Sequence, residues 1–436
     1  MLKALSTTDL TTYDSDTATG ASTSRVLLIA DSFVPMTTST AKLVKDLADE
    51  LARRGLAVTV LVPSAAAQTS CEISTEDGLE VLRIKTSRVK GAGKLLRGIR
   101  EFRFSQQIWR RVRTILSPRS YDLIIFFSPT IFFGPLVERL KKLLGCPAYL
   151  VLRDLWTQFM LDVGELKPGL AHQYLLRFEQ KQYAVADVIG VQSPGDLGYF
   201  ESDYFPESQQ VEVLFNWYAP GGRVYPITNY RERLGLANRV IFFFGGNFGV
   251  AQDPLNILRL ASSLRLEPHI HFLLVGWGSQ VPEMRKVIFE RKLSNVTLLD
   301  TVPQEDFMAM VSEVDVGLIS LDRRFNINNV PGRLLAYFCA GLPVLASVNP
   351  SSDLFAILGE NRAGHCCRNG DDDALRECAL ALASDAALRT TFGQHARAVL
   401  ETVFSPQHAV DQILSHFALG RASHLDDRAY KQKARF

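Results

Sequence analysis

Short apolar runs alternate with longer amphipathic runs along this chain, and this alternation restricts the possible folds more than any other feature. In the first half, an apolar run at 25–31 precedes an amphipathic run at 40–55, and a second apolar run follows at 57–63. Such alternation is typical of a parallel sheet covered by helices, because parallel neighbours need a crossover that is usually helical. Further strand-like runs lie at 121–128, 148–154, 186–193 and 211–217.

The alternation stops at 218–238, which contains Pro220, Gly221, Gly222 and Pro226, and then restarts. The strand-like runs of the second half lie at 240–249, 269–278, 295–300, 314–321 and 364–368. We therefore predict an α/β protein with two Rossmann-like, doubly wound domains that face a cleft. Ligands of such sheets usually bind at the carboxyl ends of the strands.

The domain boundaries follow from the same pattern. The first domain is predicted at 25–217, the linker at 218–238 and the second domain at 239–404. Residues 405–420 are expected to form a helix that crosses back to the first domain. Two tails complete the prediction: a disordered, Ser- and Thr-rich tail at 1–24 and a polar tail at 421–436.

The overall composition excludes several functional classes. The 436 residues carry a net charge of only +2, so no overall field attracts the protein to nucleic acid. The six cysteines form no C-x-x-C pair and the histidines lack metal-binding spacing, so we predict reduced thiols and no metal. The longest apolar run, 123–137, is interrupted and is shorter than the ~20 residues of a membrane-spanning helix.

Three predicted turns between a strand and a helix carry glycine or hydroxyl residues. Backbone N–H groups at such turns can bind phosphate. None of the turns has dinucleotide-binding or P-loop spacing, and each alone could be an ordinary turn. The candidate phosphate-binding residues are Thr38, Ser39, Thr40, Gly246, Asn247, Gly249, Gly276 and Gly278.

A fourth candidate anion site begins at Asn328. Pro331 and Gly332 start a predicted helix, and Asn328, Asn329 and Arg333 gather at its electropositive end. The planar guanidinium of Arg333 can hold two diphosphate oxygens at once. The alternative is that Arg333 pairs with a surface carboxylate while the asparagines only cap the helix. Taken together, the four turns favour a nucleoside-diphosphate ligand.

The order of many short motifs resembles glycosyltransferase family 4, whose members are retaining enzymes of the GT-B fold. The motifs run from Arg25 to about Leu419 and include RVLLIADSFVP, SPTIFFG, GGNFGVAQD, FLLVGWGS and VPGRLLAYFCAGLPVLASVNP. The forms RDLW, NW and VPGRLLAY are most similar to a bacterial branch that includes N-acetyl-L-fucosamine transferases of O-antigen and capsule synthesis.

Two features that are common in this family are replaced here. Family 4 enzymes commonly carry a Glu-x7-Glu pair whose second glutamate binds the ribose, and the corresponding positions are Asn328 and Ala336. A frequent basic pair in the second domain is replaced by Asn247 and Gln252. We interpret these changes as altered donor recognition in an active enzyme, with a silent enzyme as the alternative.

The resemblance implies a retaining glycosyltransferase that needs no cofactor and moves a sugar from a nucleoside diphosphate to a lipid-linked glycan. We expect an acetamido sugar, a UDP-linked donor, a polyprenyl-diphosphate-linked acceptor, and a cytoplasmic enzyme that is peripheral on the inner face of the plasma membrane. Arg333 is expected to stabilise the leaving diphosphate. Asp154 lies where a sugar would bind, although an ion pair with Arg153 would also explain it. A GT-B sugar-nucleotide epimerase and a silent binding subunit of a glycosyltransferase complex remain alternatives.

Residues 85–119 form a basic segment that contains eleven Lys or Arg and one acid, Glu101. Apolar residues recur at helical spacing from Leu95, so an amphipathic helix is predicted. We favour binding to an anionic membrane surface; the alternatives are an ordinary surface helix and nucleic acid, for which no second basic patch is present. The candidate membrane residues are Arg97, Arg100, Phe102, Arg103, Trp109 and Arg110.

Overall fold

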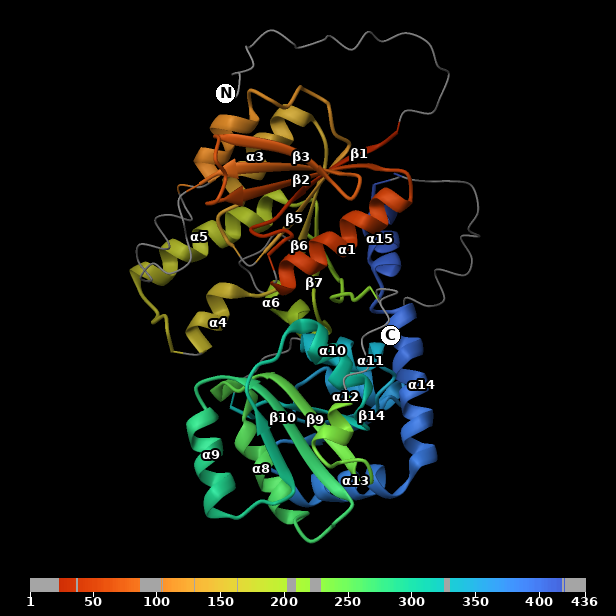
Figure 1. Cartoon of the computed structure of the whole chain (residues 1–436). Coiled ribbons are helices and arrows are strands. Elements are labelled where there is room, and N and C mark those ends of the chain that lie inside the picture. Colours follow the sequence, from red (N-terminus) through yellow and green to blue (C-terminus); the bar gives the residue numbers. More distant parts are fainter. Residues whose placement is uncertain are drawn as a thin grey trace, which may run out of the picture.

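Two largely parallel sheets with covering helices lie one above the other in the computed structural model of the chain (Figure 1). The structure describes residues 23–36, 38–86, 103, 105–128, 130–162, 164–201, 209–219, 229–324, 330–417 and 419. None of the described helices combines the length and apolar character that a membrane span requires. The two sheets confirm the predicted class, an α/β protein with two Rossmann-like domains.

The first sheet has eight strands among the described residues, in the order β3-β4-β2-β1-β5-β6-β7-β8. All neighbours are parallel except β3 and β4, which form a hairpin through Asp77 and Gly78. Both turn residues have positive φ, as Asp-Gly hairpin turns require. The sequence pattern above does not predict this hairpin, because β3 is a half-exposed edge strand. The strands are β1 (Arg25–Ile29), β2 (Ala57–Ser64), β3 (Cys71–Glu76), β4 (Leu79–Lys85), β5 (Leu123–Phe127), β6 (Ala148–Leu152), β7 (Val188–Val191) and β8 (Gln210–Val213).

Helices pack on both faces of the first sheet and form two separate hydrophobic clusters with it. Helix α1 starts at the N-cap Thr38 and buries Leu43, Leu47 and Leu51, because its apolar residues recur every three or four positions. Residues 105–112 are also helical. The other elements are α1 (Ser39–Arg53), α3 (Gly134–Leu144), α4 (Trp156–Asp162), α5 (Leu170–Val185), the 3-10 turn η1 (Pro194–Asp196) and α6 (Leu197–Phe200).

The second sheet has six parallel strands in the part of the chain that is described, in the order β11-β10-β9-β12-β13-β14. The chain reverses direction across the sheet between β9 and β12, and ligands of such sheets bind at this kind of switch point. The strands are β9 (Val240–Asn247), β10 (Ile270–Trp277), β11 (Val296–Leu299), β12 (Val316–Ser320), β13 (Val344–Val348) and β14 (Gly364–Arg368). The helices are α7 (Tyr230–Arg233), α8 (Pro254–Ser263), α9 (Val281–Glu290), α10 (Gln304–Ser312), α11 (Gly332–Cys339), α12 (Leu354–Glu360), α13 (Asp372–Ser384) and α14 (Ala386–Thr402), with the turn η2 (Val250–Gln252).

The last described helix, α15 (Pro406–Ser415), leaves the second sheet and packs beside α1 of the first (Figure 1). It buries Val410 and Ile413 in the same cluster as Leu47. Arg54 at the end of α1 forms an ion pair with Asp411. The two halves are therefore joined by the end of the chain as well as by residues 214–239.

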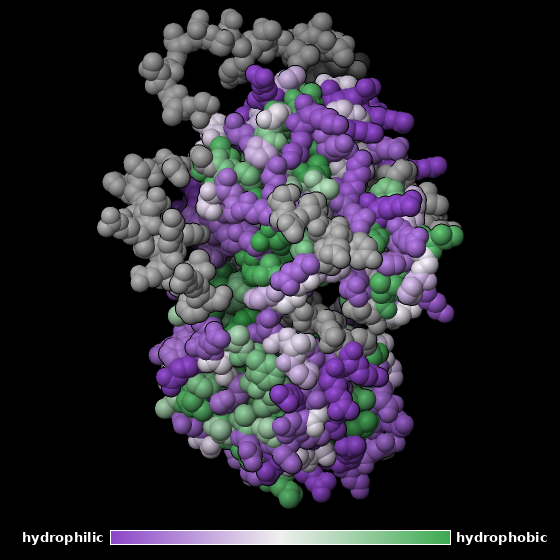
Figure 2. Space-filling view, turned by 180° about the vertical axis from the view of Figure 1, so that it is seen from behind, coloured by the Kyte–Doolittle hydropathy of each residue, from purple (hydrophilic) through white to green (hydrophobic). Residues whose placement is uncertain are grey.

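The carboxyl edges of the two sheets meet. Gly195, just after β7, donates its N–H to Asp353 Oδ2 after β13 at 3.1 Å. Nearby, the rings of Phe215 and Phe404 lie 5.1 Å apart. Seen from behind, hydrophilic side chains cover most of both halves, and hydrophobic ones gather near the level where the halves meet (Figure 2). Side chains that end strands in either sheet can therefore act on one ligand.

We predict that Ile413→Ala lowers the free energy of unfolding by about 2–5 kcal/mol, the usual cost of a cavity in a packed core. Ile413 is fully buried against the first half although it follows the second sheet in sequence. Urea unfolding followed by circular dichroism measures the change, with Leu266→Ala as control because Leu266 is 84% exposed. Equal effects of the two substitutions would contradict the packing of α15.

Candidate functional site

A buried polar cluster lies at the carboxyl edge of the first sheet. Arg153, just after β6, donates from Nη1 to Thr40 Oγ1 at 2.9 Å and from Nε to Asn216 Oδ1 at 3.3 Å. Asn216 Nδ2 donates to Gln192 Oε1 at 2.7 Å, and Gln192 donates to the Arg153 carbonyl. The backbone N–H of Arg153 donates to Ser128 Oγ at 2.7 Å. These bonds tie the ends of β5, β6 and β7 to the residues after β8 and to the start of α1.

The hydroxyl residues at the start of α1 are partly engaged by the protein. Thr38 Oγ1 accepts from the Ala41 N–H at 3.2 Å and so caps the helix. Thr40 is buried and accepts from Arg153. Ser39 is exposed, so a ligand at this helix would meet Ser39 first. The phosphate-binding role of all three residues stays a prediction.

Three carboxylates gather where the sheets meet: Asp154 after β6, Asp196 in η1 and Asp353 before α12. Desolvation raises the pKa of Asp196 to about 6, and the charges of Asp353 and Asp154 act in the same direction. Desolvation also raises the pKa of Asp154, while the cation of Arg153 opposes the shift. Arg153 itself donates to Thr40 and Asn216, so Asp154 does not share its hydrogen bonds.

Glycines bring β9 and β10 together at their carboxyl ends. Gly246 has a φ of +117°, and a Cβ on Gly276 would lie 1.8 Å from the Gly246 carbonyl oxygen. A Cβ on Gly278 would lie 2.4 Å from the backbone of Phe248. Close backbone packing alone therefore requires glycine at 276 and 278. Gly246 differs, because it faces the side chain of Arg333.

The guanidinium of Arg333, in the first turn of α11, lies over the ring of Phe244 with Cζ 3.9 Å from the ring centroid. A Cβ at Gly246 would be 3.7 Å from Arg333 Nη2, so the backbone there is open to the guanidinium. Nη1 is buried and has no hydrogen-bond partner among the described residues. Desolvation lowers the pKa of Arg333. This arrangement leaves a cation ready for an anion that the described residues do not supply.

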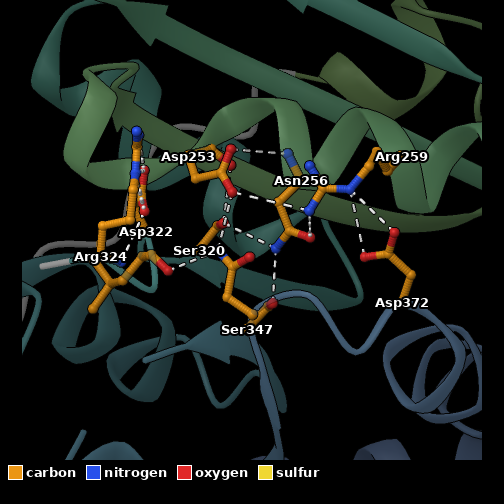
Figure 3. Close-up of polar contacts among 10 residues, drawn as sticks. Asp253, Asn256, Arg259, Ser320, Asp322, Arg324, Ser347 and Asp372 are labelled. Atoms are coloured by element: carbon orange, nitrogen blue, oxygen red, sulfur yellow. Dashed lines mark hydrogen bonds and ion pairs between the residues drawn. The ribbon is translucent and has the colours of Figure 1, made fainter. Parts of the chain in front are cut away.

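A polar network under the start of α8 connects that helix to the carboxyl ends of β12 and β13 (Figure 3). Asn256 Nδ2 donates to Ser347 Oγ at 2.7 Å and to Ser320 Oγ at 3.2 Å, and Ser320 donates to the Asp253 carbonyl. Arg259 Nη2 donates to Asn256 Oδ1 at 3.0 Å. The amide and both hydroxyls of this network have partners, so its role is to fix the start of α8 at Asp253 against β12 and β13.

The other predicted donor-binding residues are distributed around Arg333. Asn247 is exposed, and its Nδ2 donates to Gln252 Oε1 at 3.3 Å. Gly332 is the exposed first residue of α11, and Ala336 is buried in that helix. Asn328 and Asn329 lie outside the described residues.

The described part of the basic segment packs on the first sheet. Ile108 and Val112 are fully buried, and Trp109 is half-buried with the guanidinium of Arg139 5.9 Å from its ring centroid. Arg103 and Arg110 are exposed. Part of the apolar face is thus used by the core, as in an ordinary surface helix. Arg97, Arg100 and Phe102 lie outside the described residues.

Sequence reasoning missed Asp196, Asn256 and two serines, Ser320 at the end of β12 and Ser347 near the end of β13. A usable signal was present for the serines, because each is a polar residue directly after a buried apolar run, Val316–Ile319 or Val344–Ala346. Asp196 gave no such signal, because its environment is created by burial in the tertiary structure and, to a smaller extent, by the charge of Asp353 from the other half of the chain.

Comparison with known proteins identifies the activity class. Residues 40–217 match the family model described as a glycosyl transferase 4-like domain. The probable glycosyltransferase WbjE of Pseudomonas aeruginosa is 24% identical over 335 residues, which cover 73% of this chain and 79% of that protein. The putative colanic acid biosynthesis glycosyl transferase WcaI of Escherichia coli (strain K12) is 25% identical over 232 residues, 50% of this chain and 56% of that protein. The chain is a glycosyltransferase.

Solved structures show the same fold. Sucrose-phosphate synthase from Thermosynechococcus elongatus gives a TM-score of 0.65 at 17% identity, covering 91% of this chain and 98% of that chain. Anabaena HepE in complex with UDP-glucose gives a TM-score of 0.60 at 15% identity, covering 90% and 99%. The two facing Rossmann-like domains are the predicted GT-B fold.

We predict that Asp196→Asn raises the thermal unfolding midpoint at about pH 8 but leaves it unchanged at about pH 3, below the ordinary pKa of the carboxyl. The folded-state pKa, about 6, exceeds the ordinary value of 3.8, so the native state favours the protonated carboxyl. Both states are protonated at the lowest pH, and the destabilisation grows as pH rises and is complete above about 6. Differential scanning fluorimetry measures it, with the exposed Glu401→Gln as control. A pH-independent difference would contradict this assignment.

Proposed function

We propose that this glycosyltransferase transfers a sugar from a UDP-linked donor to a polyprenyl-diphosphate-linked glycan, with retention of the anomeric configuration, in the synthesis of a surface polysaccharide. The observation that carries the proposal is Nη1 of Arg333, which is buried at the carboxyl edge of the second sheet and has no hydrogen-bond partner in the part of the chain that the structure describes. In this proposal residues 25–217 bind the acceptor and residues 239–404 bind the donor.

The environment of Arg333 suits a diphosphate. Desolvation of a guanidinium is costly unless a partner anion offsets it, and no carboxylate of the described residues pairs with it. A diphosphate offers oxygens in the fork geometry that arginine prefers. In the transition state negative charge grows on the leaving diphosphate, so a fixed cation favours bond cleavage. Backbone N–H groups at Gly332 and at the Gly246–Gly249 turn would supply further donors.

The acceptor side is proposed at the carboxylates of the first domain. Asp154 lies beside the buried Arg153 cluster and does not share its hydrogen bonds, so its oxygens can accept from a sugar hydroxyl. Its proposed role is to hold the acceptor or donor sugar at the junction of the sheets. A retaining reaction on one face of the sugar needs no protein nucleophile.

The names of relatives support a role in polysaccharide synthesis, and exposed apolar and basic side chains support a lipid-linked acceptor. WcaI is named for colanic acid biosynthesis, and HepE was solved with UDP-glucose. Helices α4 and α5 expose Phe159, Leu170 and Tyr174 at 42%, 86% and 54%. Such apolar side chains, together with the basic segment at 85–119, suit a lipid-linked acceptor and a peripheral position on the inner face of the plasma membrane. An acetamido sugar is the donor sugar that we favour, from the resemblance to N-acetyl-L-fucosamine transferases.

One experiment tests the reaction. The purified chain is incubated with a panel of UDP-sugars, acetamido sugars included, and with extracted polyprenyl-diphosphate glycans. Mass spectrometry then identifies the extended glycan, and NMR gives the anomeric configuration of the new bond. Epimerised nucleotide sugar without acceptor would instead identify an epimerase. Donor binding without any product would identify a silent subunit.

We predict that Arg333→Gln lowers turnover about ten- to a hundredfold, because a charge-assisted contact to diphosphate contributes about 1.5–3 kcal/mol. Thermal stability should stay equal or rise, since an unpaired, desolvated charge is removed. The matched control is Arg231→Gln. Arg231 donates to Asp315 at 2.5 Å and to the Arg239 carbonyl, and these two partners lie just before the amino ends of β12 and β9, at the opposite edge of the sheet from Arg333. That substitution should lower stability and leave turnover unchanged. Normal turnover in Arg333→Gln would refute the diphosphate role.

We predict that the protein sediments with vesicles containing anionic phospholipid and is released at high salt, because each basic residue near such a surface contributes about 1 kcal/mol. Reversing four arginines of the basic segment to glutamate should abolish sedimentation: Arg97, Arg100, Arg103 and Arg110. A charge-matched control reverses four exposed basic residues of the second domain: Arg265, Lys286, Arg291 and Lys292. Equal binding to neutral vesicles would contradict the membrane role and support the alternative that the segment is an ordinary surface helix.

A further inference from the structure

Two cysteine thiols of the second domain lie in contact. Cys367 Sγ on β14 donates to Cys378 Sγ on α13 at 3.7 Å, although the two residues are 11 positions apart in the sequence. Both belong to one hydrophobic cluster, which the second sheet forms with helices that include α8 and α13. All six cysteines lie in the described part of the chain and are free thiols. The proposed glycosyl transfer uses neither member of this pair.

The neighbouring Cys366 lies on the other face of the sheet. Successive residues of a strand point to opposite faces, so Cys366 and Cys367 cannot contact the same helix. Cys366 packs with the cluster that includes Leu358 of α12 and Leu400 of α14, whereas Cys367 packs with the cluster of α13. Desolvation raises the pKa of Cys366 to about 12, so this thiol stays protonated and unreactive.

Cys378 is the member of the pair that small molecules in solvent can reach. Leu375 and Leu382 recur at helical spacing on the buried face of α13, and Cys378 lies half-buried at the border of that face. Cys367 is only 6% exposed and lies beneath the helix. A small oxidant therefore meets Cys378 before it meets Cys367.

The hydrogen bond between the two sulfurs makes the thiols chemically unequal. Donation by Cys367 lowers the pKa of Cys378, although burial and the charges of Glu377 and Asp371 oppose this shift. The same hydrogen bond, together with burial, raises the pKa of Cys367. Because the thiolate is the nucleophilic form of cysteine, exposure and hydrogen bonding both select Cys378 as the attacking sulfur.

We propose that Cys367 and Cys378 are a peroxide-sensitive thiol pair that closes to a reversible disulfide between β14 and α13. The Cys378 thiolate attacks one oxygen of a hydroperoxide and becomes a sulfenic acid. The O–O bond breaks, and the leaving oxygen takes a proton from water and departs as water or an alcohol. The sulfur of Cys367 then loses its proton and attacks the sulfur of Cys378. The S–O bond breaks, and the departing hydroxide takes that proton and leaves as water. The two thiols thus supply both electrons that reduce the peroxide.

The disulfide would fasten a turn that supports α8. Closing it brings the sulfurs from 3.7 Å to about 2.0 Å, a short movement for two side chains that already touch. In the turn between β14 and α13, Asn369 Nδ2 donates to Asp253 Oδ2 at 3.0 Å and to the Leu321 carbonyl at 2.8 Å. Asp253 is the N-cap of α8. Oxidation therefore fixes α13 and this turn against the sheet, and a dithiol releases them by exchange.

The test oxidises the folded full chain with hydrogen peroxide, blocks the remaining thiols with N-ethylmaleimide and digests the protein with trypsin. Cleavage separates the two cysteines, with Cys367 in the peptide 363–368 and Cys378 in the peptide 377–389. Mass spectrometry should detect a covalent link between these peptides that is absent without peroxide and is lost in dithiothreitol. The number of free thiols in the unfolded, oxidised chain should fall from six to four.

Three variants identify the sulfurs that react. Cys366→Ala is the matched control, because Cys366 shares the peptide 363–368 but lies on the other face of the sheet, and the link should persist. Cys367→Ser should abolish the link and leave a sulfenic acid on Cys378, which dimedone traps. Cys378→Ser, a change at the half-buried position, should abolish both the link and the dimedone adduct.

The outcomes decide the proposal without reference to sugar transfer. No link in the unchanged protein would overturn it, as would a link that survives in Cys367→Ser or one that disappears in Cys366→Ala. Because the readout is a mass and a thiol count, failure of the proposed donor or acceptor leaves this result unaffected.

Discussion

Parallel strand pairing is the constraint on which the rest of this structure depends. Parallel neighbours exchange hydrogen bonds only when the chain returns through a crossover, so their carboxyl ends collect at one edge. In the first sheet this brings together Thr40, Arg153 and Asn216, which are separated by up to 176 positions in the sequence, and their hydrogen bonds then fix the edge. In the second sheet the same rule brings Arg333 to the end of β9. Because Gly195 and Asp353 join the two edges, one ligand can meet both.

Polar groups at these edges divide into those that the protein satisfies and those that it does not. The amide of Asn256 and the hydroxyls of Ser320 and Ser347 bond to one another, so they add rigidity to the turn above them. Arg333 Nη1 is buried and unpartnered in the described residues. A group of the second kind destabilises the fold unless a ligand compensates it, and for that reason it marks a binding site better than sequence position alone does.

The sequence predicted the fold class because the apolar runs are long and their spacing is regular, as in the buried strands β5 and β12. It did not predict the β3–β4 hairpin, whose edge strand is half exposed and only weakly patterned. Arg333 could be selected because the start of its helix is encoded locally by Pro331 and Gly332. Asp196 could not, since its raised pKa depends on burial and on Asp353, which is more than 150 positions away. Local signals thus identified the turns, and only the tertiary structure showed which side chains the protein had already used.

The occupied side chains also change how the predicted site is interpreted. Thr38 caps α1 and Thr40 accepts from Arg153, while Gly276 and Gly278 are required by backbone packing, so none of these four needs a ligand to explain it. In contrast, Nη1 of Arg333 is buried without a hydrogen-bond partner among the described residues. Its guanidinium lies over the ring of Phe244, which stacks on Phe248, so packing holds this cation in place. A diphosphate supplies the anion that this cation lacks, so the proposed donor accounts for a buried charge that the described contacts do not explain.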